Sequence, residues 1–181
     1  MRIFLRLLGA ATILLFAVTV APYLDPGNHH PLHPVDEVSQ RVRVLGYDRQ
    51  GQFGGWQPGV REQVVARAGE LDPYTGKPFD HGAGEVDHIL PLSAAWDLGA
   101  HSWTTAERIR FANDPENLVL VSREQNQQKS DQLPGRWLPP DRGARCWYVA
   151  RMTKVAHGYQ LPLPSEDIKS GRRQCGFAKV F

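Results

Sequence analysis

Residues 84–130, GEVDHILPLSAAWDLGAHSWTTAERIRFANDPENLVLVSREQNQQKS, contain the pattern that decides the fold. The stretch VDHILPLS (86–93) reads as a β-strand followed by a turn, and LVLVS (118–122) is a short, continuous apolar strand. A helix is expected directly after the second strand, from Arg123 to about Ser130. The order strand, strand, helix, with another helix in the long connection, predicts an α+β fold.

Both helices in this stretch begin with the spacing of a capping box, in which Ser or Thr is followed three residues later by Glu or Gln. Thr104 and Glu107 mark the start of the inserted helix, which is expected to run towards Phe111. Ser122 and Gln125 repeat the spacing before the closing helix. The sequence therefore predicts two capped helices, one between the strands and one after them.

The segments before this core are expected to be short and irregular. Residues 41–56 (RVRVLGYDRQGQFGGW) alternate and end in glycines, which indicates a strand or an irregular opening turn. Residues 62–68 are a short helix candidate. The stretch DPYTGKPFD (72–80) is a turn built around two prolines and a glycine.

Polar residues at the ends of the predicted elements have the types that phosphodiester hydrolysis requires: Asp87, His88, Asn117, Asn126 and Lys129. That reaction needs a base for the attacking water and a divalent cation for the phosphoryl group and the leaving oxygen. Asp87 and His88 are adjacent, so on a strand their side chains point to opposite sides. A turn or bulge would let the carboxylate face a metal while the imidazole faces the water. Asn126 offers an amide oxygen as a second ligand, and this oxygen set favours Mg²⁺ or Mn²⁺.

These residues resemble the HNH (ββα-metal) nucleases. The matching features are the D-H dipeptide that ends a strand, the N-L that opens the next strand, and N-x-x-K in the closing helix. NQQKSDQLPG also resembles the helix end of the HNH domain in CRISPR effector nucleases, and PYTGKP stands where many HNH proteins carry that turn. YDR…FGGW, AWDLGAHSWTTAERIRFAND and WLPP…RCWY are similar to small exported bacterial HNH-family proteins. The resemblance covers roughly residues 45–160.

The resemblance implies an HNH ββα-metal core with additional helices and a role for each matching residue. His88 would be the general base, Asp87 and Asn126 would hold the metal, and Asn117 would brace the loop that carries His88. Two features depart from the family pattern. Asn126 stands where many HNH enzymes have His, which favours a hard cation, Mg²⁺ before Mn²⁺. The cysteine that often follows the early FGGW segment is missing, so no disulfide pattern carries over.

Two assignments at the site have alternatives. Glu85 lies two residues before Asp87 and is an alternative carboxylate ligand. Lys129 shares a helical face with the predicted amide ligand at i+3, and either Lys129 or Arg123 is expected to bind a phosphate.

The activity that the resemblance implies is metal-dependent hydrolysis of nucleic acid. DNA is favoured over RNA, with little sequence preference, and the chain is expected to be a monomer. Two alternatives stay open: a non-catalytic exported binding or surface module on an HNH scaffold, and a metallohydrolase that acts on another phosphoester.

Composition and charge agree with an enzyme. The 181 residues are 41% hydrophobic and 22% charged, with 17 Gly and 14 Pro, which excludes a fibrous protein and a coiled coil. The net charge is +2, but residues 22–140 hold 11 basic and 16 acidic residues while residues 141–181 hold 8 and 3. A basic C-terminal end on a near-neutral body is typical of a local surface that faces a polyanion, not of a histone-like coating protein.

The N-terminus predicts export. Residues 1–24 begin with Arg2 and Arg6 and continue as an uncharged apolar run, which is a signal peptide or a signal anchor. Pro22 directly follows a possible cleavage site and should hinder cleavage. We therefore expect the protein to be secreted or anchored at the outer face of the cytoplasmic membrane, with membrane contact only through this segment if it is uncleaved.

The rest of the chain divides into a spacer and a domain. Residues 25–40 are Pro- and His-rich and are expected to be a linker. Residues 41–181 are expected to form the HNH nuclease-like domain, with its motif core at 73–135 and a basic C-terminal extension at 141–181.

The chain has two cysteines, Cys146 and Cys175. In an exported protein they most simply form one disulfide, with a pair of unlinked thiols as the alternative. The bond would tie the C-terminal tail to the RCWY segment. It is expected to bring Arg172, Arg173 and Lys179 to one side of the site.

Overall fold

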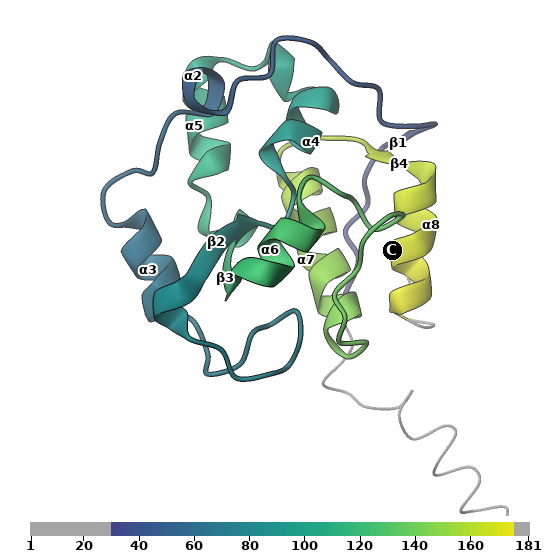
Figure 1. The fold of residues 1–181 in the computed structure, drawn as a ribbon. Helices are drawn as coiled ribbons and strands as arrows, with labels where there is room; N and C mark the ends of the chain where they lie inside the picture. The colour runs from purple at the N-terminus through teal and green to yellow at the C-terminus, as the bar shows by residue number, and fades with distance from the viewer. Residues whose placement is uncertain (1–29, 176–181) are drawn as a thin grey trace, which may run out of the picture.

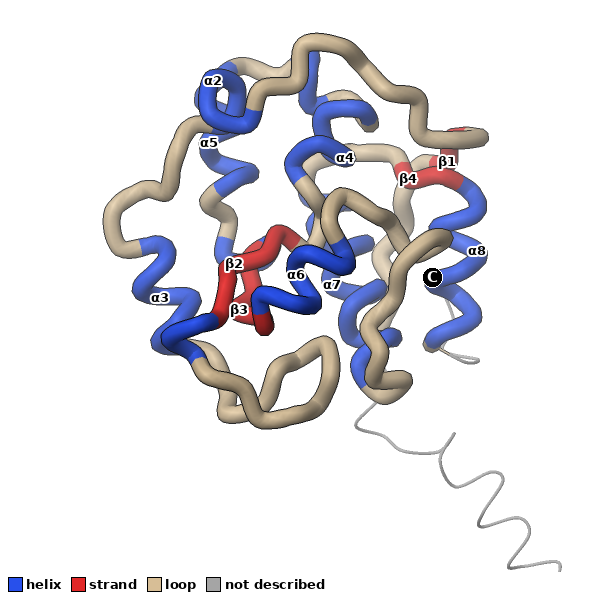
Figure 2. Tube along the Cα trace, in the orientation of Figure 1, coloured by secondary structure: helices blue, strands red, loops and turns tan. Residues whose placement is uncertain are grey.

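Helices and two small sheets make up residues 30–175, the part of the chain that the computed structural model describes (Figure 1). The predicted signal or anchor segment at 1–24 lies outside the described residues. Each sheet has two strands, β1 with β4 and β2 with β3, and most of the residues in regular secondary structure are helical (Figure 2). In chain order, with η for a 3-10 turn, the elements are β1 (Glu37–Val38), α2 (Arg49–Phe53), α3 (Val60–Ala66), η3 (His81–Ala83), β2 (Gly84–His88), α4 (Leu92–Asp97), η4 (Ala100–Ser102), α5 (Thr105–Ala112), η5 (Pro115–Asn117), β3 (Leu118–Ser122), α6 (Arg123–Lys129), α7 (Ala144–Gly158), β4 (Leu163–Pro164) and α8 (Ser165–Gln174).

The central unit is an antiparallel pair of strands followed directly by a helix. β2 and β3 pair from Gly84 opposite Ser122 to His88 opposite Leu118. Helix α6 begins at the residue after β3 and packs against both strands, while α3 lies beside them on the other side (Figure 1). The predicted order of strand, strand and helix is therefore confirmed, and so is the α+β class.

The capping box is confirmed for the inserted helix and wrong for the closing one. The Thr104 hydroxyl accepts from the Glu107 amide at 3.3 Å, and the Glu107 carboxylate accepts from the Thr104 amide at 2.8 Å. Ser122 makes no such bond to α6, because its hydroxyl donates instead to Asp72 at 2.5 Å. The Ser122 hydroxyl, which the local pattern predicts as a helix cap, bonds instead to a residue distant in the sequence.

Two segments differ from the sequence-based prediction of turns or strands. After β2 the chain turns through Pro91 and forms helix α4, where only a turn was expected. The segment 41–56 holds helix α2 and no strand. Asp48 starts α2, since its side chain accepts from the Gln50 amide at 3.1 Å.

The expected linker is wrong for residues 30–40. Leu32 is buried, and Val35 and Val38 pack against the core. β1 pairs in parallel with β4, and the His33 amide donates to the Thr153 hydroxyl at 3.2 Å. Apolar residues at every third position give this Pro-rich segment one face that packs on the body, so it is part of the fold.

Helix α7 is at the centre of the core and α8 packs along it. Tyr148, Met152 and Ala156 of α7 are fully buried. At Gly171 of α8 a Cβ would lie 2.5 Å from Val149, so only glycine allows the close approach of the two helices. A disulfide joins Cys146 in α7 to Cys175 at the end of α8, as the sequence predicted.

Within residues 30–175, the structure has no helix that is both long and apolar enough to cross a membrane.

Candidate active site

Asp87 and His88 end strand β2 and point to its two sides, as the alternation of a strand requires. The Asp87 carboxylate lies towards α6, where Lys129 contacts it. The His88 imidazole lies towards the end of α5, where it bonds to the Ala112 carbonyl oxygen. Both side chains nevertheless line the same hollow, of about 290 Å³, at the end of the strand.

The Asp87 carboxylate is held by two donors. Tyr74 donates its hydroxyl to Oδ2 at 2.6 Å, and the Lys129 ammonium lies 2.9 Å from Oδ1. Burial raises the pKa of Asp87, while the Lys129 charge and these hydrogen bonds act in the opposite direction. Each carboxylate oxygen keeps a second lone pair, so these contacts orient the group without exhausting its capacity to accept.

Lys129 differs from the expectation that it meets a phosphate. Its side chain is 0% exposed, and the ammonium donates to the His88 carbonyl oxygen at 2.8 Å in addition to its pair with Asp87. The i+3 spacing does place it on one helical face with Asn126, but Asn126 is half-buried at the hollow whereas Lys129 is fully buried where α6 packs against β2. In this structure the ammonium is therefore a partner of the carboxylate and is not accessible to a substrate.

The protonation of the His88 ring follows from its bonds. Nε2 lies 2.8 Å from the Ala112 carbonyl oxygen, and because a carbonyl only accepts, Nε2 carries the proton. Nδ1 is then the atom with a lone pair. The ring stacks on Trp56, with centroids 5.5 Å apart and planes 4° from parallel. Burial lowers the pKa of His88 to about 3, so the ring is neutral at pH 7.

Asn117 holds the chain immediately after His88. Its Oδ1 accepts from the Leu90 amide at 2.7 Å, and its Nδ2 donates to the Leu90 carbonyl oxygen at 3.1 Å. The Asn117 carbonyl oxygen also accepts from the Ile89 amide at 2.8 Å. One fully buried side chain thus closes the turn by which the chain leaves β2.

Asn126 is oriented by Glu85. Its Nδ2 donates to Glu85 Oε2 at 2.7 Å, and the other oxygen of Glu85 pairs with Arg123 at 2.9 Å. Because a carboxylate accepts only, the amide nitrogen faces Glu85 and Oδ1 is left for another partner. Asn126 lines the hollow that contains Asp87, whereas Glu85 is not among its lining residues.

Arg49 is one of two residues of the site that sequence reasoning missed; the other is Tyr74. Arg49 lines the hollow at Asp87, and it also lines a second hollow, of about 300 Å³, that contains His88 and Trp56. It is the first residue of α2, it is exposed, and no described carboxylate lies within 4.0 Å of its guanidinium. The motif YDR contains it, but only the packing of α2 brings it to the site.

The oxygen donors at the end of β2 fit a hard divalent cation. Within residues 30–175, no group of three or more His, Cys, Asp and Glu side chains could hold a metal. The Asp87 carboxylate and the Asn126 amide oxygen share one hollow, which the Asp131 carboxylate also lines. Asp131 is paired with Arg41 at 2.8 Å, whereas no described cation other than Lys129 pairs with Asp87. Cations of the Mg²⁺ type are often bound by one or two protein oxygens and keep several waters. A thiolate-preferring metal does not fit this donor set.

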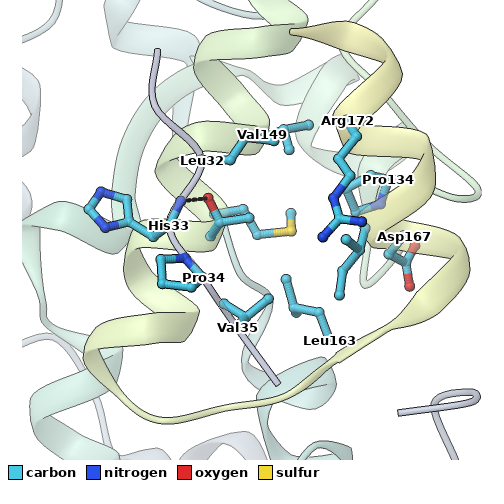
Figure 3. Close-up of a pocket in the computed structure, with 12 residues that line it drawn as sticks. Leu32, His33, Pro34, Val35, Pro134, Val149, Leu163, Asp167 and Arg172 are labelled. Carbon is cyan, nitrogen blue, oxygen red and sulfur yellow. Dashed lines mark hydrogen bonds between the residues drawn. The ribbon is translucent and has the colours of Figure 1, made fainter. Parts of the chain in front are cut away.

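Another pocket lies apart from these residues. It holds about 120 Å³ between residues 32–35, α7 and α8, and its lining is mostly apolar (Figure 3). Arg172 reaches this pocket, and its guanidinium is 3.7 Å from Glu37. Arg172 therefore faces β1. It does not line the hollow at Asp87, so the expectation that the disulfide brings it to one side of the site is wrong for this residue. Lys179 lies outside the described residues.

Comparisons with known proteins show the family of the chain. The family model described as "GmrSD restriction endonucleases, C-terminal domain" matches residues 53–162, more than half of the chain. A protein of Arthroderma benhamiae named "Uncharacterized secreted protein" is 32% identical over 193 residues, which cover 91% of this chain and 93% of that protein. No solved structure matches the chain.

Proposed function

Because the chain belongs to the family of GmrSD restriction endonuclease C-terminal domains, an HNH-type nuclease family, we propose that it is a metal-dependent nuclease that hydrolyses phosphodiester bonds. The observation that carries the proposal is that Asp87, His88 and Asn126 line one hollow at the end of β2. We propose that β2, β3 and α6 form its HNH core. The substrate is nucleic acid, and the restriction-endonuclease description of the family favours DNA over RNA.

His88 is the general base in this proposal. Its Nε2 proton is held by the Ala112 carbonyl oxygen, so Nδ1 takes the proton from the attacking water. A neutral ring is required, and burial keeps it neutral at pH 7. The negative charge of a bound phosphodiester would raise the pKa of His88 towards the range in which a base is most effective.

Asp87 and Asn126 would hold the cation, Mg²⁺ or Mn²⁺. The chemistry that such a cation supplies is charge stabilisation of the phosphoryl group and of the leaving 3′ oxygen. The protein orients both ligands beforehand. Tyr74 and Lys129 hold the Asp87 carboxylate, and Glu85 turns the Asn126 amide so that its oxygen is free.

Arg49 is the phosphate-binding residue in this proposal. It takes the role that the sequence assigned to Lys129, whose ammonium is buried. Arg123 is exposed and paired with Glu85, the carboxylate that also contacts Asn126, and it would contact a flanking phosphate. A guanidinium beside the base would bind the non-bridging oxygens in a bidentate manner and align the phosphorus with the water.

We also propose that the enzyme acts outside the cytoplasm as a monomer. Three observations support its export: the apolar N-terminal run, the disulfide between Cys146 and Cys175, and the word "secreted" in the name of the Arthroderma protein. In this proposal residues 1–24 direct export, as a signal peptide or as a signal anchor.

The test is cleavage of plasmid DNA and of RNA by the full chain with Mg²⁺, Mn²⁺ or EDTA. We expect nicked and then linear plasmid with either metal and none with EDTA. Asp87→Ala and Asn126→Ala should weaken Mn²⁺ binding in calorimetry and slow cleavage, and Arg49→Ala should slow cleavage with unchanged Mn²⁺ binding. Binding of DNA without cleavage at any metal concentration would overturn the proposal in favour of a non-catalytic module.

A further inference from the structure

The turn that contains PYTGKP is not used by the proposed chemistry, yet it lies under the site. Asp72 builds the turn: its backbone carbonyl oxygen accepts from the Gly76 amide at 2.8 Å, and its Oδ1 accepts from the Tyr74 amide at 2.8 Å. Gly76 has φ 66°, the left-handed conformation that favours glycine at such a turn. Asp72 and Tyr74 are both fully buried, which is unusual for residues of a loop.

Tyr74 reaches the first metal ligand. Its ring is packed between Trp137 and Tyr148, with centroids 5.1 Å and 5.6 Å away. Its hydroxyl donates to Asp87 Oδ2 at 2.6 Å. Because the aromatic packing fixes the ring, the hydroxyl fixes the direction of the carboxylate.

Asp72 reaches the start of the helix that carries the second ligand. Its Oδ2 accepts from the Ser122 amide at 3.1 Å and from the Ser122 hydroxyl at 2.5 Å. Ser122 is the residue before α6, and Asn126 lies one helical turn further along. The two oxygens of one buried carboxylate therefore join the turn to the beginning of α6.

We propose that the turn at residues 72–80 positions both metal ligands, with Tyr74 acting on Asp87 and Asp72 acting on Asn126 through Ser122. This inference rests on the proposed function, since it assigns those ligands a shared cation. Two ligands from different elements bind a cation well only if their separation is held constant, and a single rigid turn bonded to both does this. Neighbours that orient metal ligands typically contribute 10- to 100-fold in affinity.

Tyr74→Phe tests the inference, because it removes the hydroxyl and keeps the ring. Tyr148→Phe is the matched control: Tyr148 is equally buried in the same core, and its hydroxyl lies 3.5 Å from the Ile89 carbonyl oxygen and bonds to neither ligand. We would measure the Mn²⁺ dissociation constant of the full chain by calorimetry and thermal unfolding in EDTA. Tyr74→Phe should weaken Mn²⁺ binding about 10-fold or more, whereas Tyr148→Phe should change it less than 2-fold.

Ser122→Ala provides a second variant should Tyr74→Phe not fold. It removes one of the two bonds to Asp72 and should weaken Mn²⁺ binding a fewfold with little change in unfolding temperature. The inference would be overturned if Tyr74→Phe bound Mn²⁺ as tightly as the parent; if only Ser122→Ala folds, the same result in that variant would overturn it. Equal losses of Mn²⁺ affinity in Tyr74→Phe and Tyr148→Phe would also overturn it, and so would a parent that binds no Mn²⁺. Plasmid cleavage, measured in parallel, tests the proposed function separately. If the parent binds Mn²⁺ and Tyr74→Phe weakens that binding, but the parent never cleaves DNA, only the proposed nuclease activity is refuted.

Discussion

Replacing Lys129 by Met should destabilise the protein strongly, because the structure makes this lysine a buried partner of Asp87. Its side chain is 0% exposed and that of Asp87 is 6% exposed, with 2.9 Å between the charged groups. Met keeps most of the volume of the side chain but removes the ammonium. The Asp87 carboxylate would then be buried with the Tyr74 hydroxyl as its remaining side-chain donor.

The magnitude follows from the cost of an unpaired buried charge. Breaking a buried pair by removing one partner typically costs about 3–5 kcal/mol. For a chain of this size each kcal/mol lowers the unfolding temperature by about 2–4 °C, so we expect a loss of roughly 10 °C. Asp87→Asn added to Lys129→Met should recover part of that loss, since the double variant buries no charge.

The assay is thermal unfolding followed by circular dichroism at pH 7 in EDTA. Arg123→Met is the control, because the Arg123–Glu85 pair lies at the surface, with side chains 69% and 29% exposed, and surface pairs contribute at most about 1 kcal/mol. If Lys129→Met unfolds within 2 °C of the parent, the burial argument is refuted. A loss of DNA affinity in that stable variant would restore Lys129 as a phosphate ligand.

Three further predictions concern the base, the disulfide and pH. His88→Ala should lower plasmid cleavage about 10²–10⁴-fold with Mn²⁺ affinity within a fewfold of the parent, and a parental cleavage rate would exclude it as the base. Replacing Cys146 and Cys175 by Ser should lower the free energy of unfolding by about 3 kcal/mol in denaturant titrations; two alkylation adducts on the unreduced, exported parent would contradict the bond. Because the pKa of His88 falls from 6.5 to about 3 on folding, the unfolded chain binds the extra proton between these values, so stability is lost as pH falls below 6.5. Between pH 7 and pH 5 in EDTA, the free energy of unfolding of the parent should fall by about 2 kcal/mol more than that of His88→Gln. An equal fall in the two proteins would count against the burial of a neutral His88 ring.

Features that depend on local pattern could be predicted from the amino-acid sequence. LVLVS predicts β3 because a short apolar run between turn residues has few other conformations, and Thr104 and Glu107 predict the start of α5 because a capping box is a contact within one turn of helix. Two cysteines in a chain whose N-terminus predicts export predict one disulfide, and the structure confirms the bond. The order of these elements was sufficient to predict the α+β class and the neighbourhood of Asp87 and His88.

The side of each element that faces the interior could not be predicted, because it depends on the packing of distant segments. The spacing N-x-x-K places Lys129 and Asn126 on one side of α6 but does not tell whether that side meets water or β2. Ser122 has the spacing of a cap, yet its hydroxyl bonds to Asp72, fifty residues away in the chain. Arg49 and Tyr74 reach the site from separate segments, through the packing of α2 and through the turn under β2. A local pattern specifies the direction of a side chain relative to its own backbone, whereas its partner depends on which distant segment buries that face, and this is decided only when the whole core packs.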